Sequence, residues 1–165
     1  MNTKAGDRPA TANSHSERRL HHVGVVVRDI EAEIDGFARS IGGGHWKGRI
    51  FHDPLQKVKV TFIESTTAGE PQIELVEPAA DDSPVWVFLR AGGGLHHLCY
   101  EVDDLDSYLC ELRKAGSKTI RPPLPAVAFD GRRIAWVVTR AKVLLELLER
   151  LPVQSGLHAG VGQAI

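Results

Sequence analysis

The sequence predicts an α+β fold of two tandem modules, each a strand, a helix and three further strands (βαβββ), which together form an open half-barrel cleft. The first observation is a repeat: the motif L-H-H-x4-V-x-D-(aliphatic) begins at Leu20 and again at Leu95, 75 residues later. The second is the order of segments, because each copy is followed by one helix-like pattern and several strand-like runs. An internal period this long indicates a duplicated supersecondary unit.

The first module begins with LHHVGVVV (20–27), a β-branched run bounded by polar residues, which predicts a strand. Asp29 is placed to cap a helix over 30–41, where apolar residues recur at helical spacing until the glycine run 42–44. Apolar and polar residues then alternate in KVKVTFI, as in a strand with one buried face. In all, three strand-like segments follow the helix, at 45–51, 57–63 and 72–77.

The second module repeats this plan. LHHLCYEV (95–102) is a predicted strand, and Asp104 is placed to cap a helix over 105–116. The proline-rich stretch 122–131 is a loop or an edge strand, since proline cannot donate a hydrogen bond to a neighbouring strand. Further strands are expected at 118–121, 132–139 and 143–149.

The modules are expected to form one domain with extensions at both ends. The leader is polar without an apolar stretch, and the tail is rich in glycine and alanine without periodicity. Between the modules, DSPVWVFLR (82–90) predicts a short helix capped by Asp82 or Ser83. The predicted organisation is a disordered leader (1–19), one domain (20–150, with modules at about 20–78 and 95–150 and a linker at 79–94) and a flexible tail (151–165).

Composition indicates a protein that acts on small molecules. The formal net charge is −1, with 42% hydrophobic and 25% charged residues, so no basic field indicates nucleic acid or an anionic membrane. No apolar run approaches the ~18 residues that a membrane span needs, and the N-terminus has no signal-peptide pattern. The two cysteines, Cys99 and Cys110, cannot build a disulfide framework, which favours the reducing cytoplasm.

The repeated histidines are candidate metal ligands. Neighbouring side chains alternate between the faces of a strand, so one histidine of each pair should face the cleft and the other should point away: His21 or His22, and His96 or His97. The sequence E-L-x-E ends each module, and its three-residue spacing also places one carboxylate of each pair in the cleft: Glu74 or Glu77, and Glu146 or Glu149. Two imidazoles with two carboxylates suit a divalent first-row ion such as Mn, Fe, Co, Ni or Zn.

Six segments carry a family resemblance: LHHVGVVV, KVKVTFI, QIELVEP, GGGLHHLCYEVDDL, GRRIAWV and LLELLE. In this order, over residues 20–149, they resemble the vicinal-oxygen-chelate superfamily of glyoxalases, bleomycin resistance proteins and dioxygenases. The resemblance is nearest to methylmalonyl-CoA epimerases and metal-dependent glyoxalase I proteins. It implies the vicinal-oxygen-chelate fold, a homodimer, and one divalent metal ion held by His22, Glu74, His97 and Glu146.

The resemblance also implies the chemistry. A divalent ion that binds two oxygens of a thioester or hemithioacetal stabilises the enediolate that forms when the neighbouring carbon loses a proton. Glu146 would move that proton, with Glu74 as its counterpart on the opposite face. The leading hypothesis is a methylmalonyl-CoA epimerase-like isomerase that acts on an acyl-CoA. Arg132 and Arg133 are candidate contacts for a phosphate or carboxylate of the substrate's carrier group.

Three other functions stay open. A glyoxalase I-type lactoylglutathione lyase would use nearly the same metal site but return the proton to the neighbouring carbon. A dioxygenase would need a triad of two histidines and one carboxylate with open positions, which a fourth ligand at Glu74 disfavours. A metal-assisted small-molecule binding or resistance protein would use the cleft without catalysis, and the intact ligand set disfavours it.

Overall fold

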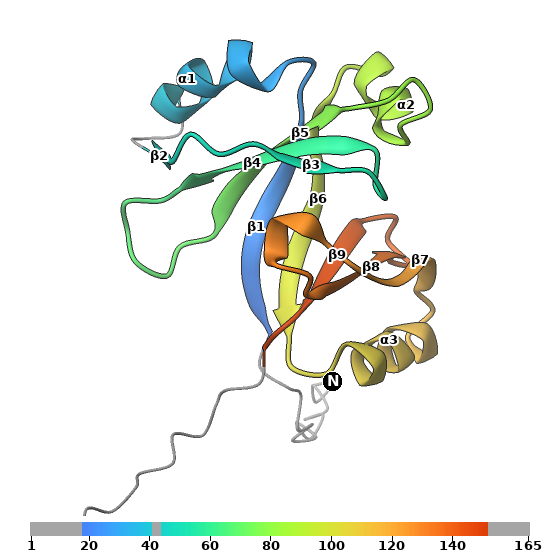
Figure 1. Ribbon diagram of the computed structural model, residues 1–165. Coiled ribbons are helices and arrows are strands. Elements are labelled where there is room, and N and C mark those ends of the chain that lie inside the picture. Colours follow the sequence, from blue (N-terminus) through green and yellow to red (C-terminus); the bar gives the residue numbers. More distant parts are fainter. Residues whose placement is uncertain (1–17, 41–43, 152–165) are drawn as a thin grey trace, which may run out of the picture.

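The computed structural model describes residues 18–40 and 44–151, so most of the predicted leader and tail lies outside the described residues. Across the described residues one sheet of nine strands runs through both modules, in the order β2-β4-β5-β1-β6-β9-β8-β7, with β3 paired to β4 (Figure 1). The predicted α+β architecture of two βαβββ modules is confirmed. The modules do not form separate sheets, because their first strands, β1 and β6, pair with each other.

The first module places its strands on one side of β1. Its elements are β1 (Arg19–Val26), α1 (Ile30–Ser40), β2 (His45–Trp46), β3 (Phe51–Asp53), β4 (Val58–Glu64) and β5 (Gln72–Pro78). β1 and β5 are parallel neighbours, and β4 pairs antiparallel with β5. The single strand predicted over 45–51 is wrong: β2 and β3 are separate short strands that both pair with β4, and between them Gly48 has a φ of 72°.

The helix α2 (Val85–Arg90) links the modules. The second module contains β6 (Gly94–Val102), α3 (Leu105–Lys114), β7 (Lys118–Pro125), a 3-10 turn η1 (Val127–Phe129), β8 (Arg133–Val138) and β9 (Leu144–Glu149). The predicted cap of α3 is confirmed, since the Asp104 side chain accepts a hydrogen bond from Ser107 N at 2.9 Å. The predicted cap of α2 by Asp82 or Ser83 is wrong, because Pro84 stands at the N-cap without a side-chain hydrogen bond.

The proline-rich stretch forms part of an edge strand. β7 continues through it to Pro125, at the end of the sheet where only β8 is a neighbour. This position suits proline, since an edge strand needs hydrogen-bond donors on one side only. The edge-strand alternative is therefore correct for the first part of 122–131, and η1 follows it.

The core lies largely between the sheet and one helix from each module. The buried side chains of α1 and its part of the sheet are Val25, Val27, Ile30, Ile34, Ile63 and Leu75. The equivalent group around α3 is Val102, Leu105, Tyr108, Leu109, Ala135, Val137 and Leu147. Burying each Leu, Ile or Val contributes about 1.5–3 kcal/mol. Because both helices cover the outer face of the sheet, the inner face is free to form a cleft.

Two β-bulges interrupt the pairing of β1 with β6. His21 is the extra residue of the first bulge, and His96 is the extra residue of the second. A bulge breaks the alternation of side chains between the two faces. The expectation that His21 and His96 point away from the cleft is wrong for His96, which lines the same cavity as His97. His21 lines a second cavity, and each of the two rings contacts the ring of the histidine that follows it.

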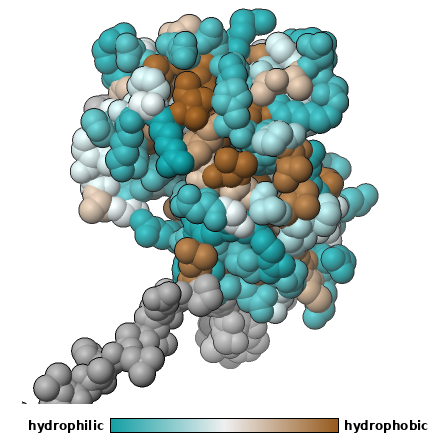
Figure 2. All heavy atoms as spheres, viewed as in Figure 1, coloured by the Kyte–Doolittle hydropathy of each residue, from teal (hydrophilic) through white to brown (hydrophobic). Residues whose placement is uncertain are grey.

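None of the described helices is long and apolar enough to cross a membrane. Figure 2 shows hydrophobic side chains gathered in the middle of one face, between the more polar surfaces of the two modules. On the inner face of the sheet, β3 of the first module contacts η1 of the second, so residues distant in the sequence meet across the cleft.

Candidate metal centre

Four side chains converge at the centre of the sheet. They come from four adjacent strands: Glu74 on β5, His22 on β1, His97 on β6 and Glu146 on β9. Their ligand atoms all lie within 4.8 Å of one another, and all four residues are buried. These are the four ligands that the family resemblance implies, and we refer to them as the tetrad.

The distances within the tetrad suit a single small cation. His22 Nε2 and His97 Nε2 lie 3.1 Å apart. Glu146 Oε2 lies 3.1 and 3.7 Å from these two nitrogens, and Glu74 Oε2 lies 3.4 and 3.3 Å from them. Ligands of one first-row ion have such separations, because each lies about 2.0–2.2 Å from it.

An unsatisfied oxygen supports the same interpretation. Glu146 Oε2 is buried and makes no hydrogen bond of good geometry with any residue in the described part of the chain. A buried carboxylate oxygen without a partner is costly. A cation between the imidazoles and carboxylates would satisfy it, so this nitrogen and oxygen donor set fits a divalent ion.

The charges of the tetrad stabilise each other. Burial opposes ionisation of Glu74 and Glu146, but the two imidazoles outweigh it and lower the pKa of both carboxyls. Burial likewise opposes protonation of His22 and His97, but the carboxylates outweigh it and raise the pKa of both imidazoles. Without a cation, protons on the imidazoles balance the carboxylates, and a bound cation would replace those protons.

Each tetrad imidazole meets a second histidine through its other ring nitrogen. His21 Nδ1 lies 2.9 Å from His22 Nδ1, and His96 Nδ1 lies 3.1 Å from His97 Nδ1. Burial, helped by the adjacent tetrad imidazole, lowers the pKa of His21 and of His96 to about 4. Both outer imidazoles are therefore neutral at pH 7 and can accept a hydrogen bond.

Gly24 and Cys99 occupy equivalent positions in the two modules, two residues after a tetrad histidine. Each stands on a strand between a tetrad histidine and a tetrad glutamate of the neighbouring strands. A Cβ on Gly24 would lie 1.9 Å from Cε1 of His97, so glycine is required to leave room for that ring. Cys99 is fully buried, and it stands opposite His22 in the pairing of β6 with β1.

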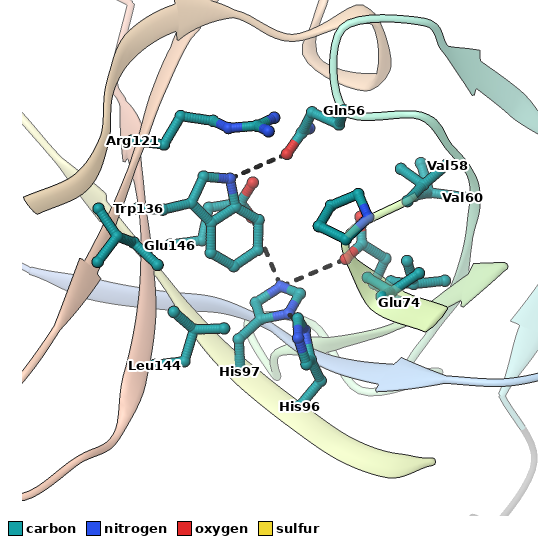
Figure 3. A pocket seen from close by; sticks show the side chains of 14 residues that line it. Gln56, Val58, Val60, Glu74, His96, His97, Arg121, Trp136, Leu144 and Glu146 are labelled. Carbon is teal, nitrogen blue, oxygen red and sulfur yellow. Dashed lines mark hydrogen bonds and ion pairs between the residues drawn. The ribbon is translucent and has the colours of Figure 1, made fainter. Parts of the chain in front are cut away.

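A cavity of about 370 Å³ opens beside the tetrad, and Figure 3 shows Glu74 and Glu146 on either side of His97 in it. Most of its other walls are apolar: Val58, Val60, Val76, Pro84, Val85, Ile120 and Leu144. Trp136 lies edge-on to His97, with 4.7 Å between ring centroids, and donates from Nε1 to Gln56 Oε1 at 2.9 Å. We call this space the main cavity.

A second cavity, of about 340 Å³, lies beside His21 and Phe129. Arg132 lines it and donates to Glu101 Oε1 at 2.6 Å. Arg133 lines neither cavity, because its guanidinium binds the Glu149 carboxylate through two nitrogens and also contacts Asp106. Of the two arginines expected at the carrier group, only Arg132 therefore faces a space that could hold a ligand.

Three polar residues of the main cavity were not predicted from the sequence. Arg121 is the only lysine or arginine among the described residues that line this cavity, and it donates to Leu55 O at 3.3 Å. Gln56 lies in the turn after β3, and Trp136 lies in β8. Alternation along β8 gives a weak signal for Trp136, whereas nothing in the local sequence marks Gln56 or Arg121.

The fold and the tetrad together define a class of protein, and comparison with known families agrees. Residues 21–136 match the family model of the glyoxalase/bleomycin resistance protein/dioxygenase superfamily. The chain belongs to this superfamily, so the resemblance found in the sequence is confirmed.

Particular relatives narrow this class. The chain is 31% identical over 121 residues to the ethylmalonyl-CoA/methylmalonyl-CoA epimerase of Cereibacter sphaeroides, covering 72% of this chain and 87% of that one. It is 32% identical over 143 residues to the uncharacterised protein YqjC of Bacillus subtilis, covering 85% and 98%. Among solved structures, a variant of Streptomyces coelicolor methylmalonyl-CoA epimerase in complex with 2-nitronate-propionyl-CoA matches with a TM-score of 0.68 and 25% identity, covering 84% and 98%. The two relatives with a named activity are epimerases, which are enzymes of the isomerase class.

Proposed function

We propose that the protein is a divalent-metal-dependent epimerase that removes and returns a proton at the carbon next to a thioester carbonyl. The observation that carries this proposal is the pair of buried carboxylates, Glu74 and Glu146, that line the main cavity from opposite modules. The named relatives support the choice of an acyl-CoA as substrate, with methylmalonyl-CoA as the first to test.

The tetrad would hold the metal through His22, His97 and the two glutamates. A bound divalent ion would supply Lewis-acid polarisation of the carbonyl oxygen, which acidifies the neighbouring carbon. The apolar walls of the main cavity would exclude water from the reacting carbon. Burial in such a site favours the protonated form of a carboxyl, in opposition to the imidazoles, and would help Glu74 or Glu146 to take up a proton.

An epimerase needs an acid–base group on each face of the reacting carbon. Glu146 would take the proton from one face, and Glu74, from the other module, would serve the opposite face. Both carboxyls are ionised in the resting tetrad because the imidazoles lower their pKa.

Arg121 would bind an anionic part of the substrate. It is the one guanidinium that lines the main cavity in the described part of the chain, and no described carboxylate forms an ion pair with it. Arg132 stays a candidate contact for a carrier group that reaches the second cavity. Arg133 is less suited, because Glu149 and Asp106 already occupy its guanidinium.

Deuterium exchange tests the proposed reaction. Purified protein supplied with Co(II) or Mn(II) should incorporate solvent deuterium into methylmalonyl-CoA at the carbon between the two carbonyl groups. Elemental analysis should find a divalent ion in the protein and little in His22→Ala. Absence of exchange with either metal would exclude this substrate, and equal metal content in both proteins would exclude the tetrad as the site.

A glyoxalase I-type lyase is the second candidate. The superfamily includes glyoxalases, and two carboxylates flanking one metal site could also move a proton between neighbouring carbons. Thioester formation from methylglyoxal and glutathione, followed by absorbance, would distinguish this activity from epimerisation. A dioxygenase is disfavoured, because four protein donors in the tetrad leave fewer open positions than oxygen activation uses.

A further inference from the structure

Both ligand histidines have a histidine as their outer partner. The two contacts join equivalent atoms, since Nδ1 of the tetrad ring faces Nδ1 of the preceding residue, at 2.9 Å for His21–His22 and 3.1 Å for His96–His97. We propose that His21 and His96 are positioning residues, each of which accepts a hydrogen bond from Nδ1–H of the tetrad imidazole beside it, so that the N–H of the metal-bound ring is on Nδ1 and its Nε2 is directed at the metal. The inference rests on the proposed metal site.

The direction of these hydrogen bonds follows from the inner nitrogens. A neutral imidazole carries one N–H, on either Nδ1 or Nε2. The two Nε2 atoms of the tetrad face each other at 3.1 Å and also face two carboxylate oxygens, which is where a cation would lie. To bind it, both must be unprotonated, so the N–H of each ring is on Nδ1. Each outer histidine must then be the acceptor.

A buried N–H requires an acceptor, and here the protein provides an unusual one. The outer partner of a metal-binding imidazole is commonly a carboxylate, a backbone carbonyl or water. His21 Nδ1 lies within hydrogen-bond distance of His22 Nδ1, and His96 Nδ1 within that of His97 Nδ1; the thiol of Cys99 also contacts the His22 side chain. A neutral acceptor adds no negative charge to a tetrad that already holds two carboxylates.

The backbone is built to allow this contact. In a regular strand adjacent side chains point to opposite faces, and His21 could not reach the ring of His22. The bulges at His21 and His96 remove this obstacle, and they occur at the same position of both modules. The duplicated unit thus contains the ligand, its partner and the bulge that joins them.

Aromatic contacts hold the outer rings in place. His21 lies edge-on to Phe129, with 5.4 Å between centroids, and His96 lies edge-on to Phe88 at 4.8 Å. Both outer histidines are only half-exposed. A ring fixed in this way can fix the ring to which it is hydrogen-bonded, so the tetrad imidazoles are oriented before a metal arrives.

Paired substitutions at each outer histidine separate hydrogen bonding from packing. In His21→Asn and His96→Asn, the amide oxygen can replace the accepting Nδ1, whereas His21→Leu and His96→Leu fill space without an acceptor. Cobalt(II) affinity should fall about ten- to hundred-fold in the Leu variants and stay within a few-fold of wild type in the Asn variants. His52→Leu, an exposed position on β3 outside both cavities, is the matched control.

A second measurement reads the proton directly. In zinc-loaded protein labelled with nitrogen-15, two-bond correlations should identify His22 and His97 as Nδ1–H tautomers and His21 and His96 as Nε2–H tautomers. The opposite tautomers at the outer rings would overturn the inference. So would wild-type cobalt affinity in both Leu variants, or equal losses in the Asn and Leu variants.

The outcome is distinguishable from failure of the proposed function. If wild-type protein binds cobalt(II) with the expected variant pattern but exchanges no deuterium into methylmalonyl-CoA, the proposed substrate fails and the positioning role stands. If wild-type protein binds no divalent ion, both proposals fail. Thermal unfolding of each metal-free variant would verify that it folds. If a Leu variant fails to fold, the tautomers measured in the wild-type protein still decide the inference.

Discussion

His22 Nε2 and His97 Nε2 lie 3.1 Å apart, although 75 residues separate the two histidines in the chain. They occupy equivalent positions of the two modules, and their strands pair antiparallel, which brings equivalent atoms face to face. The carboxylates follow the same plan, because Glu74 and Glu146 stand on the strands that flank β1 and β6. One candidate site is thus assembled from two halves, and each module contributes one histidine and one glutamate to it.

Replacing Glu146 with glutamine should abolish proton transfer with little change in shape. Glutamine keeps the size of the side chain but cannot accept a proton, and loss of a general base typically lowers the rate about 10²–10⁴-fold. Deuterium exchange into methylmalonyl-CoA in the presence of excess Co(II) would measure this. Because the change also removes one anionic ligand, metal occupancy must be measured in the same sample.

Glu33→Gln is the matched control for this prediction. Glu33 is exposed on α1, away from the tetrad, and its removal should leave exchange unchanged. Exchange by metal-loaded Glu146→Gln at the wild-type rate would show that another group moves the proton.

Adding one methyl group at Gly24 should disrupt the tetrad by displacing the His97 ring. The new Cβ would overlap the His97 ring, at 1.9 Å from Cε1, so the ring or the strand must move. We expect Gly24→Ala to lower the free energy of unfolding by about 1–3 kcal/mol, as overpacking does, and to weaken cobalt(II) binding at least ~10-fold. Chemical denaturation and calorimetric titration would measure the two effects.

The equivalent position of the other module gives the control. Cys99→Ala removes the thiol that contacts His22 and Glu146 but adds no atom that would displace them, so it should cost about 1 kcal/mol of stability and leave the tetrad able to bind metal. Equal cobalt(II) affinity in Gly24→Ala and wild type would mean that His97 is not held where the structure has it.

The sequence predicted those features that depend on local pattern. Helical spacing identified α1 and α3, alternation identified β4, and the repeat of L-H-H and E-L-x-E identified the four tetrad residues once the family resemblance was applied. Local sequence patterns did not predict features that depend on how strands pair with each other. The bulges at His21 and His96 arise from the register of β1 against β6, and no residue in either strand marks the extra position.

Several residues that line the main cavity also could not be predicted from local sequence. Gln56 and Trp136 are 80 positions apart and meet through a hydrogen bond between side chains. Arg121 reaches the same cavity from the edge strand β7. Such contacts form only when the two modules pack against each other, so they leave no local sequence signal. The predicted substrate contacts at Arg132 and Arg133, in contrast, rest on a short basic run. In the structure that run is largely paired with carboxylates.

Metal binding should strengthen as pH rises. The carboxylates raise the pKa of His22 and His97 above the ordinary value of about 6.5, and a metal must displace these protons. The rise in melting temperature caused by Co(II) should therefore increase between pH 6 and pH 8. A cobalt-induced shift that is the same at both pH values would contradict this, and His22→Ala, which lacks a ligand, should show little shift at either.

Metal-free protein should respond in the opposite sense over the same range. A raised imidazole pKa contributes stability that is fully present below about pH 6.5 and is lost as pH rises through the folded-state value. The lowered pKa of Glu74 and Glu146 contributes stability that is present above about pH 4.5 and is lost as pH falls towards the folded-state values. The melting temperature measured in the presence of a chelator should therefore fall as pH increases from 6 to 8, whereas the cobalt-induced rise in melting temperature should increase.

Arg121→Ala should weaken binding of an acyl-CoA more than it slows the reaction. Arg121 lines the main cavity without an ion-pair partner among the described residues, so it is available to an anionic group of the substrate. A charged hydrogen bond contributes about 1.5–3 kcal/mol, which predicts a KM increase of roughly ten- to hundred-fold with kcat nearly unchanged. The difference from wild type should shrink at high ionic strength if the contact is exposed to solvent.

Arg132→Ala decides which cavity receives the carrier group, because Arg132 lines the second cavity and not the main one. If the carrier leaves through the main cavity, KM rises in Arg121→Ala and stays near wild type in Arg132→Ala. The reverse pattern would assign the carrier to the second cavity and make the sequence-based choice of Arg132 the correct one. Arg113→Ala, at an exposed position on α3, should change neither constant and controls for the loss of one positive charge.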